Sequence, residues 1–187
     1  MLKGVEGFRS AALLTIIIAG CAEVAERPAA PIPTAEAQIS SGSSGTSVSS
    51  MTPADQEVPL PQLPAGASEI DADAPKTFAV TDSGLRYRVL RKGTGKVPTS
   101  DSKVEVHYHG WLNNGQVFDS SYNRGESISF PLNGVIPGWT EGMQLVNEGG
   151  MIELEIPSKL GYGDSGSPPK IPGGATLHFL VELLNSK

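Results

Sequence analysis

Hydrophobic and polar residues alternate in several short stretches after residue 84, and this period of two predicts β-strands. In the clearest long stretch, the apolar residues Val104, Val106 and Tyr108 fall on one face and polar residues fall between them. Asn113-Asn114-Gly115 follows that stretch and predicts a hairpin turn. Strands are therefore expected at 85–90, 103–112, from 117 onward, 127–132, 151–156 and 175–184.

One segment has a helical period instead. Trp139, Met143 and Val146 recur at i, i+4 and i+7, which places them on one face of a helix. Pro137 suits the first helical turn, where no backbone donor is needed, and the glycine pair at 149–150 is expected to end the helix.

A helix this short is not stable alone in water, so it must lie on the strands that flank it. Many strands and one short helix predict an α+β fold in which a curved antiparallel sheet wraps around the helix. Trp139 is then expected to be the floor of an apolar hollow, with Val135 and Ile136 at its edge.

The chain changes composition before residue 76. Residues 22–75 contain no aromatic residue and are rich in Pro, Ala, Ser, Gly and acids. Such a segment cannot bury enough apolar surface to offset its ordering entropy, so 21–75 is predicted to be a disordered tether and 76–187 the folded domain. The net charge of −6 belongs to the tether, because the rest of the chain is close to neutral. A nucleic-acid partner is therefore not expected.

The N-terminus has the features of an export signal. Lys3 and Arg9 precede an apolar run, 11–19, which is too short to span a bilayer. Ile18-Ala19-Gly20-Cys21 resembles the lipobox of bacterial lipoproteins, which implies a signal peptide at 1–20 and a lipid on Cys21. An ordinary secretory signal with an incidental cysteine is the alternative. Ala22 resembles the residue that directs lipoproteins to the outer membrane of a Gram-negative cell, facing the periplasm.

Five blocks in the domain resemble one family, the FKBP-type peptidyl-prolyl cis-trans isomerases. They occur in the family's order between residues 84 and 184, and they are 106–110, 115–121, 135–139, 161–163 and 171–177. The resemblance implies a half-barrel of antiparallel strands around a short helix. It also implies isomerisation of X-Pro bonds in unfolded or partly folded exported polypeptides. A macrolide inhibitor is implied as well, and no metal or organic cofactor is.

The resemblance places two groups of site residues on this chain. The catalytic group is Tyr108, Phe118, Asp119 and Tyr162, and the substrate-binding group is Phe130, Val135, Ile136, Trp139, Ile171 and Phe179. In this scheme the Tyr162 hydroxyl and the Ile136 N–H donate to substrate carbonyls. Asp119 lies at the rim and orients groups there, either beside the displaced carbonyl or bonded to Tyr108. The chain departs from the family at Ile128 and Lys170, where the family commonly has an aromatic and an apolar residue.

Other functions compete with this one. The aromatic residues alone are equally typical of the core of a small β domain. The same site could hold proline-containing segments without turnover, as in a holdase or docking domain, and a purely structural envelope protein is a third hypothesis. His107 and His109 share a strand face, but the sequence places no third metal ligand beside them. No dimerisation arm is recognised, so a monomer is expected.

Overall fold

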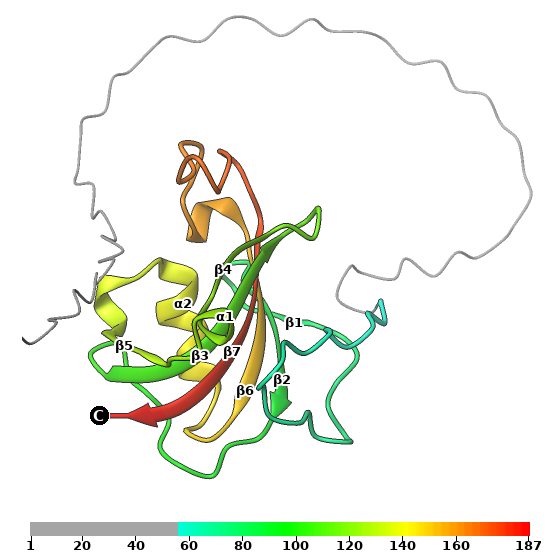
Figure 1. Ribbon diagram of the computed structural model, residues 1–187, viewed down its shortest axis with the longest axis vertical. Helices are drawn as coiled ribbons and strands as arrows, with labels where there is room; N and C mark the ends of the chain where they lie inside the picture. The colour runs from blue at the N-terminus through cyan, green and yellow to red at the C-terminus, as the bar shows by residue number, and fades with distance from the viewer. Residues whose placement is uncertain (1–55) are drawn as a thin grey trace, which may run out of the picture. The chain divides into compact units, whose positions relative to one another are not determined.

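The computed structural model describes residues 56–187, and these residues form a seven-stranded antiparallel sheet with short helices (Figure 1). The strand order is β1-β2-β6-β7-β3-β4, with β5 paired to β3. The elements are β1 (Ala79–Val80), β2 (Arg86–Arg91), β3 (Lys103–Leu112), β4 (Val117–Ser120), α1 (Ser121–Arg124), β5 (Ile128–Pro131), η1 (Leu132–Gly134), α2 (Pro137–Gly142), η2 (Met143–Leu145), β6 (Met151–Ile156), η3 (Ser158–Leu160) and β7 (Leu177–Ser186). The α+β prediction is confirmed.

Strand β3 organises the sheet. It pairs along its length with β7, and its other edge pairs first with β5 and then with β4. The predicted alternation holds, because Val104, Val106 and Tyr108 are buried and the residues between them are only half-buried. The predicted hairpin joins β3 to β4, with Gly115 in the left-handed region at a φ of 80°.

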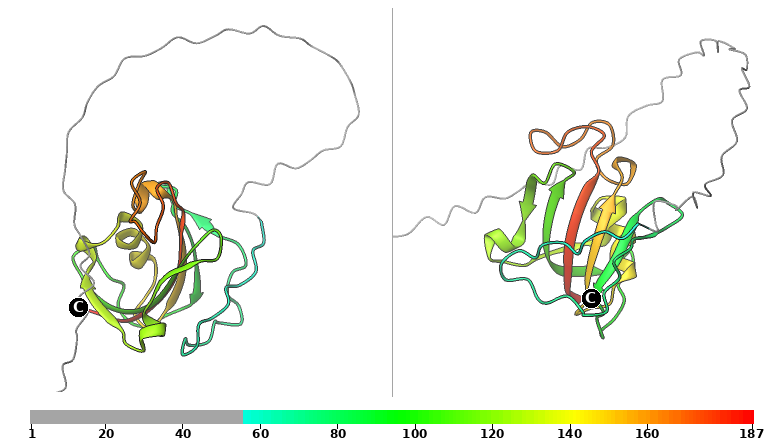
Figure 2. Two further views of the ribbon diagram at one scale, coloured as in Figure 1. Left: turned by 45° about the horizontal axis from the view of Figure 1, so that its top comes forward. Right: turned by 90° about the vertical axis from the view of Figure 1, so that its right-hand side faces the viewer.

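Helix α2 lies on the concave face of the sheet (Figure 2). It begins with Pro137 at its first turn, and Ile136 is its extended N-cap. Gly138 and Gly142 let the helix approach β6 closely, since a Cβ atom on them would lie 2.5 Å from Ile156 and 2.7 Å from Leu154. The helix ends at Gly142 and continues as the 3-10 turn η2.

The predicted helical stripe is buried. Trp139 is 5% exposed, and Met143 and Val146 are 0% and 1% exposed. They belong to the main core between α2 and the concave face. A second, smaller core lies on the other face of the sheet, where Leu90, Met151 and Leu180 pack with Leu63, Ile70 and Trp111.

That second core exists because residues 58–76, called the outer strap here, cross the convex face of the sheet (Figure 2). The Arg88 side chain is 0% exposed and donates to the carbonyl oxygens of Val58 at 2.8 Å, Pro59 at 2.7 Å and Lys76 at 3.3 Å. The N–H of Asp71 donates to the Leu90 carbonyl of the β2 edge at 2.9 Å.

The prediction of a structureless tether up to residue 75 is therefore wrong for the outer strap. The two strap residues that pack in the second core, Leu63 and Ile70, are too few to show a period, and the strap binds mainly through backbone carbonyls. The strap also explains why Glu153 of β6 is only 5% exposed, because it pairs with Arg88 under the strap at 2.6 Å.

No helix within residues 56–187 is long and apolar enough to cross a membrane. The predicted signal peptide at 1–20, the predicted lipid attachment at Cys21 and the first part of the predicted tether lie outside the described residues.

Candidate functional site

Four aromatic rings meet around the indole of Trp139. Its ring centroid lies 5.2 Å from that of Phe179, 5.4 Å from that of Phe130 and 5.6 Å from that of Tyr108, each in an edge-to-face arrangement. Phe118 joins the group through Phe179, at 5.4 Å. Each such pair of rings contributes roughly 0.5–1.5 kcal/mol of stability beyond the contribution of the apolar area that it buries. The structure thus brings together predicted site residues from β3, β4, β5, α2 and β7.

Gly110 makes this convergence possible. It lies on β3 beside Phe179 of β7, to which it is paired in the sheet. A Cβ atom at Gly110 would lie 2.7 Å from the Phe118 ring and 2.8 Å from the Phe179 ring. The two rings occupy the space that any other residue would fill. Gly110 lies in the family block 106–110, but the sequence alone does not predict this packing role.

The aromatic group forms a largely buried floor. Trp139 and Phe179 are 5% exposed, and Phe118 and Tyr108 are 7% and 8% exposed. The predicted rim is more accessible, since Phe130, Val135 and Ile136 are half-buried and Tyr162 is 39% exposed. Ile171 is 5% exposed and packs against the same core.

Two hollows lie away from the indole, and Trp139 lines neither of them. One, of about 460 Å³, lies between the strap and β2 and includes Phe78, Tyr87 and Val89. The other, of about 430 Å³, lies along the outside of α2 and shares Val135 with the predicted site. The apolar hollow predicted over the indole of Trp139 is neither of these two, and it stays a prediction.

A polar group adjoins the rings. The Tyr108 hydroxyl donates to Asp119 Oδ2, and Arg124 Nη1 pairs with Asp119 Oδ1. Arg124 Nη2 also donates to the Tyr108 oxygen at 2.9 Å, and its guanidinium lies 5.5 Å from the centre of the Tyr108 ring. Burial and the bond to Asp119 raise the pKa of Tyr108 to about 12, so the phenol remains a donor at neutral pH.

Of the two positions predicted for Asp119, the structure has the one in which its carboxylate is bonded to Tyr108. Arg124 was missed. Its only sequence signal is a basic residue five positions after Asp119, and that spacing brings the two together only because the short helix α1 intervenes.

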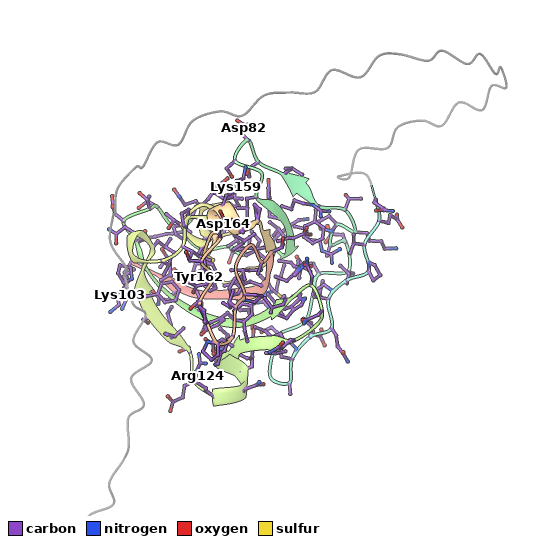
Figure 3. All side chains as sticks on the ribbon, turned by 90° about the horizontal axis from the view of Figure 1, so that it is seen from above. Asp82, Lys103, Arg124, Lys159, Tyr162 and Asp164 are labelled. Carbon is purple, nitrogen blue, oxygen red and sulfur yellow. The ribbon has the colours of Figure 1, made fainter. Side chains whose placement is uncertain are left out.

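The two predicted substrate donors have no hydrogen-bond partner among residues 56–187. Within residues 56–187, neither the Tyr162 hydroxyl nor the Ile136 N–H donates to a hydrogen bond. Figure 3 shows Tyr162 on the loop after η3 and Arg124 on α1. Burial raises the pKa of Tyr162, and the nearby charge of Asp119 adds to the effect, so this phenol too remains protonated.

The histidines lie on the convex face, away from these rings. His107 contacts the Ser121 hydroxyl at 3.0 Å and stacks on Tyr122, and His178 contacts Asn113 Oδ1 at 2.6 Å. His109 has a buried Nδ1 atom without a hydrogen-bond partner. Among residues 56–187 no three His, Cys, Asp or Glu side chains gather as metal ligands.

Lys170 and Ile128, the two departures from the family pattern, differ in exposure. Lys170 is exposed on the loop just before Ile171, whereas Ile128 is half-buried and packs against the main core.

Known proteins are similar to this chain in sequence. Residues 95–184 match the family described as FKBP-type peptidyl-prolyl cis-trans isomerase. The chain is 51% identical over 104 residues to the FKBP-type 22 kDa peptidyl-prolyl cis-trans isomerase of Escherichia coli (strain K12), a match that covers 56% of this chain and 50% of that one.

Solved structures agree. The crystal structure of FkpA from Escherichia coli is 48% identical, with a TM-score of 0.57, and the match covers 59% of this chain and 51% of that one. The crystal structure of AtFKBP13 is 36% identical, with a TM-score of 0.55, and the match covers 59% of this chain and 98% of that one. The chain spans about half the length, or less, of the curated relatives it matches.

Proposed function

The chain belongs to the FKBP-type peptidyl-prolyl cis-trans isomerase family, and from this premise we propose that it catalyses rotation about X-Pro peptide bonds in polypeptides. The observation that carries the proposal is the polar group Tyr108–Asp119–Arg124, which is held against the aromatic rings around Trp139.

The chemistry requires little of a catalyst. Rotation of an amide costs roughly 18–20 kcal/mol because its resonance must be lost, and no covalent bond breaks. An X-Pro bond populates both isomers but exchanges over tens of seconds or longer. A site that binds the twisted amide better than either planar form accelerates the exchange.

The aromatic floor supplies an apolar surface for the proline ring. Trp139, Phe118 and Phe179 exclude water from one side of the amide, whose planar ground state water stabilises. The Tyr162 hydroxyl and the Ile136 N–H then donate to substrate carbonyls and hold the peptide across the floor.

Asp119 acts as an orienting group. Its two carboxylate oxygens are engaged by Tyr108 and Arg124, and Oδ1 also accepts the N–H of Ser120 at 2.9 Å. A carboxylate whose oxygens are already occupied by these donors is placed to hold neighbouring groups and not to remove a proton from the substrate. The carboxylate instead fixes the Tyr108 ring against the indole.

The direct test is the isomerisation rate of a proline tetrapeptide, with and without a macrolide. We expect acceleration that falls at least about tenfold in Asp119→Ala and also falls in Tyr162→Phe. Asp101→Ala and Tyr87→Phe are matched controls outside the site and should retain the wild-type rate. If the protein suppresses aggregation but has no effect on the isomerisation rate, it is a holdase and not an enzyme.

We also propose where in the cell the protein acts and which polypeptides it acts on. The motif ending at Cys21 supports a lipid anchor on the outer side of the cytoplasmic membrane, or on the periplasmic face of an outer membrane where one exists. The substrates are then exported polypeptides that are unfolded or partly folded, and the protein acts as a monomer. Cys21→Ser should move the protein from the membrane to the soluble fraction and remove the lipid mass. An ordinary secretory signal predicts no lipid mass in the wild type.

A further inference from the structure

Helix α1 (Ser121–Arg124) is too short to hold its own position. It has four residues, and an isolated helix of this length is unstable because the free-energy cost of nucleating it exceeds the stabilisation from one helical turn. Yet its last residue, Arg124, is the one that engages both Asp119 and Tyr108. Contacts from outside the helix must therefore place Arg124.

The start of α1 is fixed to β3. The Ser121 side chain is 0% exposed, and its hydroxyl accepts the Tyr108 N–H at 2.7 Å and lies 3.2 Å from the Tyr108 carbonyl. These contacts fix one end of α1 but leave the direction of the helix open.

The second residue of α1 is fixed to the convex face. The Tyr122 hydroxyl donates to Glu182 Oε2 at 2.7 Å, and its ring stacks on His107 with centroids 4.8 Å apart and planes 22° apart. Burial and the bond to Glu182 raise the pKa of Tyr122, so the phenol stays protonated and keeps donating.

Glu182 is itself immobilised. It lies on β7, is 3% exposed, and accepts Arg91 Nη2 of β2 at 2.7 Å. The backbone N–H of Ser68 in the outer strap lies 3.4 Å from the same carboxylate. Three segments distant in sequence, β2, the strap and α1, thus meet at one carboxylate.

We propose that Tyr122 and Glu182 are positioning residues for the isomerase site. The Tyr122–Glu182 bond anchors α1 from the convex side, and α1 in turn holds Arg124 on the Asp119–Tyr108 pair at the concave side. The inference rests on the proposed function. It adds that the convex face and the strap, which do not touch the substrate, set the geometry of the site.

The test uses the full chain and a double-mutant cycle. Tyr122→Phe should lower kcat/KM for the proline tetrapeptide by about three- to tenfold, because a small misplacement of an orienting group is costly. In an Arg124→Gln background the same substitution should have little further effect, since Tyr122 acts through Arg124. Tyr87→Phe removes a phenol hydroxyl near the opposite edge of the sheet and should leave kcat/KM unchanged.

A second readout does not depend on activity. NMR relaxation of the Arg124 Nε–H should show a rigid side chain in the wild type and in Tyr87→Phe, and a mobile one in Tyr122→Phe. An inactive wild type with a rigid Arg124 that loosens in Tyr122→Phe overturns the proposed function and leaves the positioning intact. A rigid Arg124 in Tyr122→Phe, or equal losses of kcat/KM in both backgrounds, overturns the positioning role.

Discussion

The Tyr108 and Trp139 rings meet almost at right angles, with planes 87° apart and centroids 5.6 Å apart. This contact joins the polar group to the aromatic floor, because the Tyr108 hydroxyl is the one that donates to Asp119. The indole therefore does two things: it fills the core beneath the site, and it supports the ring that carries the site's polar end.

Replacing the indole should consequently affect stability and activity together. Trp139→Leu removes a 5% exposed side chain and should lower the free energy of unfolding by about 3 kcal/mol, as a large-to-small core change does. It should also abolish most of the isomerase activity of the fraction that remains folded. Urea unfolding and the tetrapeptide assay measure the two effects.

Leu180→Ala is the matched control, because Leu180 is 1% exposed in the second core on the convex face. It should cost a similar amount of stability and leave the activity of folded protein intact. A purely structural envelope protein predicts instead that Trp139→Leu changes stability alone and leaves peptide binding as it was.

Gly110→Ala tests the close packing of the two phenylalanines. The added methyl group would lie within 2.8 Å of the Phe118 and Phe179 rings, so one of them must move. Overpacking of this kind costs about 1–3 kcal/mol, and the displaced ring should also reduce kcat/KM. Gly134→Ala meets only an ordinary contact, at 3.5 Å from Pro131, and should change the free energy of unfolding far less. Equal effects of the two substitutions would show that the Phe118–Phe179 contact is not tight.

The strands and the helix α2 could be predicted because burial imposes a period on local sequence. Val104, Val106 and Tyr108 alternate because one face of β3 meets the core, and Trp139, Met143 and Val146 repeat because one face of α2 does. Asp119 and Tyr162 could be assigned to the site because they lie in the family blocks 115–121 and 161–163.

Residues that act through long-range polar contacts could not be found this way. Arg88 alternates as an outward-facing residue would, and nothing nearby in sequence shows that carbonyl oxygens of the strap cover it. Glu182 collects donors from three separate segments, and Arg124 reaches Asp119 only after α1 turns the chain. Such contacts have no sequence period, so three-dimensional packing alone reveals them.

Two histidines on the convex face, His109 and His178, should make the free energy of unfolding depend on pH. Burial lowers the pKa of His109 and of His178 below the usual value of 6.5. The unfolded chain then binds more protons than the folded one, so the contribution is present above about pH 6.5 and is lost as the pH falls through the folded-state pKa. Urea midpoints measured between about pH 7.5 and pH 5 should therefore fall, and His109→Gln/His178→Gln should flatten the decline. An unchanged slope in the double variant would contradict the assignment to these two rings.

Arg88→Met tests the outer strap. In the wild type the guanidinium is buried against Glu153 and donates to strap carbonyls, and it also lies 4.6 Å from the centre of the Phe78 ring. Removing one member of a buried ion pair leaves the other charge uncompensated, which costs about 3–5 kcal/mol. We therefore expect a loss of this size in urea unfolding, and faster protease cleavage within 58–75 under native conditions, because the strap loses its main donor.

Arg86→Met on the same strand is the matched control. Arg86 pairs with Glu155 at 2.7 Å, but their side chains are 26% and 22% exposed, and an accessible pair of this kind contributes less than about 1 kcal/mol. The double variant Arg88→Met/Glu153→Leu should recover part of the stability lost in Arg88→Met, since no buried charge then remains. It should not restore protease resistance, because a methionine side chain has no donor for the carbonyls of Val58 and Pro59. Recovery of both properties would show that the ion pair, and not the guanidinium–carbonyl contacts, holds the strap on the sheet.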